Sequence, residues 1–164
     1  MFKINDYVMY GVTGVCKILD IKEETDRNRE IKEYYVLSPV YSKNTIIKTP
    51  VNNVKISMRK IHSLEEVNSL IRNIPTEKTV WIEDEKSRSE EFKSMLRSGE
   101  CENLIKLVKS IYENKKNKSE LGKKAYKGDE EIMKTAERLI IEEFATILEI
   151  SPDEVQSYIL SKIS

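Results

Sequence analysis

Apolar and polar residues alternate in short stretches along roughly the first sixty positions, a period typical of strands. The opening run is rich in β-branched and aromatic residues, and Gly11 and Gly14 permit a tight corner between two strands. The pattern predicts five strands, at Tyr7–Tyr10, from the corner to Glu24, and at Glu33–Leu37, Asn44–Pro50 and Val54–Ile61. Five short strands with no helical period favour a small antiparallel barrel.

The period changes to that of a helix directly after His62. Ser63 and Glu66 have the spacing of a capping box, and apolar residues then recur at helical intervals until Pro75. A further helix is predicted from Ser87 to Gly99, which suits a left-handed C′ position. Others are predicted after Cys101, from about Asp129, and from Pro152, which suits a first helical position. Short amphipathic helices with short connections are typical of a compact bundle.

These patterns predict an α+β protein of two domains. Residues 1–62 are expected to form a small antiparallel β-barrel, and residues 63–164 an all-α helical bundle. Within the second domain, 63–74 is the predicted junction helix and 75–85 a linker that carries the only tryptophan, Trp81.

Charge is distributed unevenly, although the formal net charge is zero. Residues 1–62 hold 11 Lys and Arg against 7 Asp and Glu, a surplus of 4, and the remainder holds 17 against 21, a deficit of 4. A basic run nevertheless crosses the helical half: Lys106, Lys109, Lys115, Lys116, Lys118, Lys123, Lys124 and Lys127. Such a run either binds a polyanion or is a solvated face, and the sequence leaves both open.

Catalytic, metal and membrane signals are missing from the sequence. Cys16 and Cys101 lie far apart and are expected to be buried apolar residues, and no zinc spacing or glycine-rich phosphate loop is present. The lone histidine, His62, is expected to pack or cap at a helix entrance. A hydrolase or lyase site around His62 is a less favoured alternative. Because these catalytic and metal motifs are missing, we expect a protein that is not an enzyme and needs no cofactor or metal. Because the sequence contains no membrane-spanning segment or export signal, we expect a cytoplasmic protein.

Several local sequences, in their order, resemble the CarD family of bacterial transcription regulators. They are the opening run, Tyr34–Leu37, Lys48–Pro50, the helix that ends at Ser98–Gly99, and the basic helix after it. The resemblance covers essentially the whole chain and implies a Tudor-like barrel followed by a helical bundle. The family carries proline and histidine in the first corner, where this chain has Gly11, Val12 and Thr13.

The resemblance implies that the barrel binds the RNA polymerase β subunit by adding a strand to it, which is β-augmentation. The matching edge is Ile46–Lys48, where Lys48 replaces an arginine of the family and loses its bidentate fork. A second basic position of the family falls near Glu24, so a nearby turn arginine is expected to replace it. The expected polymerase-binding residues are Arg27, Arg29, Ile46, Ile47, Lys48 and Pro50.

The resemblance also implies that the bundle contacts promoter DNA at the upstream edge of the bubble and stabilises the open complex. The tryptophan that the family wedges into the minor groove would align near Glu85, whereas Trp81 lies four residues upstream, so Trp81 is either a wedge or a core residue. Binding without sequence specificity is expected from Trp81, Lys86, Arg88, Lys93, Arg97, Lys123, Lys124 and Lys127. A monomer is expected. The alternative is a polymerase-bound adaptor whose bundle binds another protein and never touches DNA.

Overall fold

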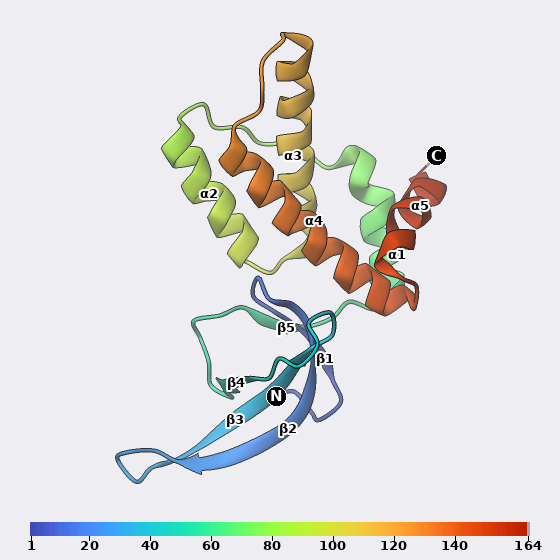
Figure 1. Cartoon of the computed structure of the whole chain (residues 1–164). Coiled ribbons are helices and arrows are strands. Elements are labelled where there is room, and N and C mark those ends of the chain that lie inside the picture. The colour runs from blue at the N-terminus through green and yellow to red at the C-terminus, as the bar shows by residue number, and fades with distance from the viewer. Residues whose placement is uncertain (164) are drawn as a thin grey trace. The chain divides into compact units, whose positions relative to one another are not determined.

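A computed structural model describes residues 1–163 of the chain (Figure 1). The chain divides into two compact units, one of Met1–Ile61 and one that begins at His62. The first unit is an antiparallel sheet and the second is helical, so the protein is α+β.

The sheet has five antiparallel strands in the order β4-β3-β2-β1-β5. Their bounds are β1 Tyr7–Tyr10, β2 Gly14–Thr25, β3 Ile31–Pro39, β4 Ile47–Pro50 and β5 Met58–Lys60. Because β4 and β5 each pair on one side only, the sheet is open and the expected closed barrel is not confirmed. The β2–β3 ribbon extends far beyond the short outer strands (Figure 1).

One face of the sheet carries the core of the unit. Its buried cluster is Val8, Tyr10, Cys16, Ile18, Tyr35 and Leu37. A bulge in β2 explains why Ile18 and Ile21, three positions apart, both face this cluster: the strand pairing skips Leu19 and shifts the alternation by one residue. Leu19, next to Ile18, lies on the opposite face by ordinary alternation and is exposed, and the bulge returns Ile21 to the core face.

Two predicted strands are shorter than the apolar pattern indicated. β5 begins only at Met58, because the Asn53 side chain folds the preceding residues into a turn: its Oδ1 accepts from the Lys55 and Ile56 amides at 3.0 and 3.2 Å. β4 likewise begins at Ile47, after a turn in which Asn44 has a φ of +65°. Local side-chain hydrogen bonds of this kind compete with strand pairing.

Residues 62–163 of the second unit contain five α-helices and one 3-10 turn. They are α1 Leu64–Asn73, η1 Ile74–Thr76, α2 Glu85–Arg97, α3 Cys101–Glu120, α4 Lys127–Leu148 and α5 Pro152–Ile163. α2 begins two residues before the predicted start, because Asp84 and not Ser87 is its N-cap and accepts from the Ser87 amide at 2.9 Å. Gly99 follows α2 with a φ of +73°, as its predicted role as a C′ residue requires.

The helical core lies mainly between α3 and α4, against which α2 and α5 pack. Cys101 is buried there, and Cys16 is buried in the sheet, so the prediction that both are small buried residues is confirmed. No helix within residues 1–163 is long and apolar enough to span a bilayer.

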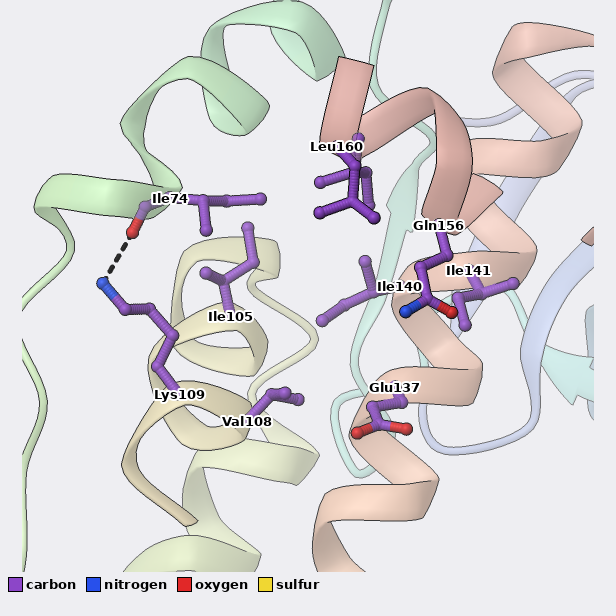
Figure 2. Close-up of a pocket in the computed structure, with 10 residues that line it drawn as sticks. Ile74, Ile105, Val108, Lys109, Glu137, Ile140, Ile141, Gln156 and Leu160 are labelled. Atoms are coloured by element: carbon purple, nitrogen blue, oxygen red, sulfur yellow. Dashed lines mark hydrogen bonds between the residues drawn. The ribbon is translucent and has the colours of Figure 1, made fainter. Parts of the chain in front are cut away.

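Lys109 ties the segment after α1 to α3. Its Nζ donates to the backbone oxygens of Ile74 and Glu77 at 2.6 and 2.7 Å, beside an apolar hollow between η1, α3, α4 and α5 (Figure 2). The ammonium group thereby donates to one carbonyl at the end of α1, which also accepts from the Glu77 amide, and to one carbonyl just after η1. This anchor positions the start of the segment that carries Trp81.

A buried carboxylate holds the beginning of the helical unit. Glu143 in α4 is 0% exposed and accepts from the backbone N–H of His62 at 3.0 Å. The Nδ1 atom of His62 lies 3.3 Å from the Glu66 carboxylate, so the histidine side chain packs at the start of α1. Sequence patterns did not indicate Glu143, because charged residues in amphipathic helices are normally solvated.

The capping box of α1 forms as predicted and gives a pH-dependent contribution to stability. Ser63 Oγ accepts from the Glu66 amide, and the Glu66 carboxylate accepts from the Ser63 amide. That backbone hydrogen bond, with the His62 side chain, lowers the pKa of Glu66 below its usual range. A lowered pKa stabilises the fold above the unfolded-state value, and this contribution is lost as the pH falls through the folded-state value.

Glu66→Gln is therefore expected to be less stable than the wild type at about pH 7, with a difference that shrinks below about pH 4. Urea denaturation at both pH values measures it. Glu65→Gln is the matched control, since Glu65 is also an acid of the first turn but makes no capping contact. A difference between Glu66→Gln and wild type that grew at acid pH would contradict this assignment.

Candidate functional site

The outer edge of β4 is an unpaired strand edge. β4 pairs with β3 through Ile47 opposite Leu37 and Lys48 opposite Val36, and no strand within residues 1–163 pairs with its other side. Such an edge offers backbone N–H and C=O groups to a strand from another chain. Ile46, just before it, is 61% exposed, so an apolar side chain accompanies the free edge.

The side chains of β4 divide between the core and the solvent. Ile47 packs against the core cluster and Thr49 is buried, whereas Lys48 and Pro50 are exposed. Of the residues expected to bind polymerase at this edge, Ile46, Lys48 and Pro50 are therefore accessible. Pro50 lacks an N–H, which limits how far strand pairing can continue along this edge.

Lys48 already has an intramolecular partner. Its Nζ forms a salt bridge with the Glu24 carboxylate of β2, and it lies 4.9 Å from the centre of the Tyr34 ring on β3. Both charged side chains are about half exposed, so the pair is a weak one. Glu24, an acid near an expected basic position, therefore lies against Lys48.

Arg27 and Arg29 lie in the turn at the tip of the β2–β3 ribbon, where the Asp26 side chain accepts from two backbone amides. Arg29 has a φ of +63°. Lys48 pairs with Val36, which lies five residues along β3 from Ile31 at the ribbon tip. Five residues of strand span roughly 17 Å. The structure does not bring these two arginines together with Lys48.

Trp81 lies in the segment between η1 and α2 and is partly buried. Its ring packs edge-to-face on Phe92 at 5.8 Å, and the Arg88 guanidinium lies 4.6 Å from its centre. Val80 next to it donates its N–H to Ser110 of α3 at 2.9 Å. Trp81 is thus packed against the bundle on one side and remains partly exposed on the other, and a contact of this ring with DNA stays a prediction.

Arg88 is a buried structural residue. It is 5% exposed, and its guanidinium is 3.0 Å from Asp129, which is 2% exposed. It also donates to the carbonyls of Ile82 and Glu83, so it joins α2, α4 and the tryptophan segment. The expectation that Arg88 neutralises DNA phosphates does not fit this burial, because a buried and paired guanidinium is not available to a phosphate.

The other basic residues expected on α2 are exposed and share one face. Lys86, Lys93 and Arg97 are spaced by seven and four residues, which brings them into line along the helix. Glu90 lies in the same line and reduces its net positive charge. The face remains available to phosphates but is only weakly basic.

A second basic surface surrounds the connection between α3 and α4. Lys123, Lys124 and Lys127 are exposed there, and Lys124 lines a hollow of about 370 Å³ together with Lys118, Trp81 and Tyr126. The same hollow is lined by Glu83 and Glu85, and the Glu85 carboxylate raises the pKa of Tyr126. The structure therefore brings Trp81 together with lysines of the basic run, and with acids.

Asp129, the buried partner of Arg88, was missed by the sequence analysis. It opens a helix, where an acid is already explained by the helix dipole, so nothing indicated its ion pair with Arg88. The signal that could have found the pair is the spacing of Arg88 four residues before the buried Phe92, which places both on the inner face of α2.

Comparison with known families assigns the sheet unit. Residues 2–62 match the family model of the CarD-like/TRCF RID domain, which is a little over a third of the 164 residues. A search of the curated proteins found no match to this chain. The match covers the sheet with its β4 edge and ends where the helical unit begins.

Proposed function

From the premise that residues 2–62 form a CarD-like RNA polymerase-interacting domain, we propose that this chain is a bacterial transcription regulator tethered to polymerase. The β4 edge binds the polymerase β subunit, and the helical unit contacts promoter DNA at the upstream edge of the bubble and stabilises the open complex. The role is non-catalytic, and the protein acts as a monomer.

The observation that supports this proposal most is a free strand edge in a domain of the polymerase-interacting class. Strand addition supplies main-chain hydrogen bonds, and exposed side chains beside the edge give selectivity. Ile46 and Lys48 are the exposed apolar and charged side chains that flank this edge. Ile47 supports it from the core side.

The DNA contact follows from the basic surfaces of the helical unit and from the tether. Because the helical half has a net charge of −4, it is a poor free DNA binder. Attachment to polymerase raises the effective concentration of DNA at the helical unit, so weak contacts to phosphates suffice. The exposed side chains proposed for them are Lys86, Lys93, Arg97, Lys123, Lys124 and Lys127, with Trp81 beside the last group.

Replacing Lys123, Lys124 and Lys127 together by glutamine is expected to weaken DNA binding severalfold and to flatten its salt dependence. Each phosphate that is no longer neutralised reduces the slope of log K against log salt by about 0.9. Fluorescence anisotropy with labelled duplex DNA over a salt series measures both quantities. The matched control replaces three exposed lysines elsewhere in the helical unit, Lys78, Lys134 and Lys162. Equal losses in both triple variants would contradict a specific role for the first group.

A second candidate is a polymerase-bound adaptor whose helical unit binds another protein. It is favoured by the packing of Trp81 on Arg88 and Phe92, and by Glu83 and Glu85 beside it. The only tryptophan of the chain is a direct probe, because DNA that reaches its exposed side changes its fluorescence. Titration with a forked duplex separates the two: the regulator predicts a saturable change, and the adaptor predicts none.

A further inference from the structure

A hollow of about 430 Å³ lies on the face of the sheet opposite the core cluster. Three paired residues of the sheet form its floor. Tyr7 of β1 is opposite Lys17 of β2, and Lys17 is opposite Ser38 of β3. Directly opposed residues point to the same face, so these three side chains form one row across the sheet. The segment from Pro39 to Asn44, which follows β3, provides the remaining lining. We call this feature the sheet hollow.

Apolar side chains in the sheet hollow are exposed to solvent. Tyr7 is 37% exposed, Leu19 43% and Val40 38%. Leu19 lies two residues after Lys17 along β2 and one after the core residue Ile18, so it shares the face of Lys17. The bulge of β2 between Ile18 and Asp20 lies directly beside this hollow, and bulges are over-represented next to active sites.

The charges of the sheet hollow are all of one sign. Lys17 and Lys43 line it, and none of its nine lining residues is acidic. Three lysines of this unit are paired with acids, Lys32 with Asp26, Lys48 with Glu24 and Lys60 with Asp6, whereas no salt bridge to Lys17 or Lys43 forms among residues 1–163. The sheet hollow therefore combines an apolar floor with two cations that have no acidic partner.

We propose that the sheet hollow docks an acidic peptide segment of a partner protein, which places an apolar side chain against Tyr7, Leu19 and Val40 and its carboxylates beside Lys17 and Lys43. Complementary charge sets the orientation, and the apolar contact supplies the affinity. DNA matches the hollow less well than such a peptide, because a phosphate backbone offers no apolar group to contact the exposed Leu19 and Val40. None of the residues proposed to bind polymerase lines this hollow, so it is a second docking surface.

The test uses the full chain and a fluorescein-labelled peptide in which aspartates surround one phenylalanine. Anisotropy is expected to show saturable binding, weakened about threefold to tenfold by Lys43→Glu and by Leu19→Ser, in keeping with about 1 kcal/mol per exposed contact. Lys55→Glu is the matched control, because Lys55 is an exposed lysine of the same unit outside the hollow. A peptide with serine in place of phenylalanine is expected to bind more weakly.

The proposal is overturned if Lys43→Glu and Lys55→Glu bind the peptide with equal affinity, or if the two peptides bind equally well. It is also overturned if duplex DNA competes with the peptide and its binding is weakened by the same two hollow variants. Binding of each variant to the polymerase β subunit is measured in parallel. Lys43→Glu and Leu19→Ser are expected to keep it, so failure of the sheet hollow and failure of the β4 edge give different results. Circular dichroism shows that each variant is folded.

Discussion

Arg88→Ala is expected to lower the free energy of unfolding of the helical unit by about 3–5 kcal/mol, the usual cost of removing one partner from a buried ion pair. The change leaves the Asp129 carboxylate buried without its cation and frees the carbonyls of Ile82 and Glu83. Because Arg88 also lies against the Trp81 ring, tryptophan fluorescence reports the local loss directly. Urea denaturation followed by fluorescence and by circular dichroism measures both.

The control for this prediction removes both charges at once. Arg88→Met combined with Asp129→Leu is expected to recover most of the lost stability, since an apolar pair of similar volume leaves no charge unpaired. Lys86→Ala, on the exposed side of the same helix, is expected to change stability by less than about 0.5 kcal/mol. A loss in Arg88→Ala no larger than that in Lys86→Ala would show that the pair does not hold α2 to α4.

Lys48→Glu is expected to weaken binding to the polymerase β subunit by about tenfold or more, which corresponds to about 1.4 kcal/mol. The substitution reverses the charge beside the free edge, and it places two carboxylates together at Glu24. Surface plasmon resonance with the purified β subunit measures the change. The variant should remain folded, because Lys48 is exposed and its salt bridge is weak.

The internal partner of Lys48 provides the matched controls. Glu24→Gln releases the ammonium group and is expected to keep or strengthen binding. Glu24→Lys combined with Lys48→Glu restores an internal ion pair but leaves the charge beside the edge reversed, so it should not restore binding. Full recovery in that double variant would show that the single substitution acted through the fold and not through the interface.

Elements with strong local signals could be predicted from the sequence. The capping box at Ser63, the corner at Gly11 and Gly14, and the left-handed Gly99 are set by neighbouring residues, and each forms as the pattern predicts. The closed barrel is the fold prediction that is not confirmed, because closure requires β4 and β5 to pair across the sheet, and no local period reports such a pairing. The bulge at Leu19 is likewise visible only from the register of its partner strand.

The candidate site was harder to predict than the fold. Arg88 looks like a phosphate ligand among the basic residues of the sequence, yet its place on the inner face of α2 makes it structural. Glu24 is visible in the sequence as an acid near an expected basic position, but its pairing with Lys48 depends on two strand registers. Ion pairs between distant segments therefore decided which cations are available, and sequence spacing does not encode them.

Protection of promoter DNA by the polymerase complex tests the central claim most directly. Nuclease footprints of polymerase on a promoter are compared without the protein, with the wild type and with Lys48→Glu. If the sheet unit tethers a helical unit that contacts DNA, the wild type extends protection upstream of the bubble, and Lys48→Glu loses the extension at the same concentration. A wild-type protein that binds the β subunit without adding upstream protection, or an extension that persists in Lys48→Glu, would contradict the account.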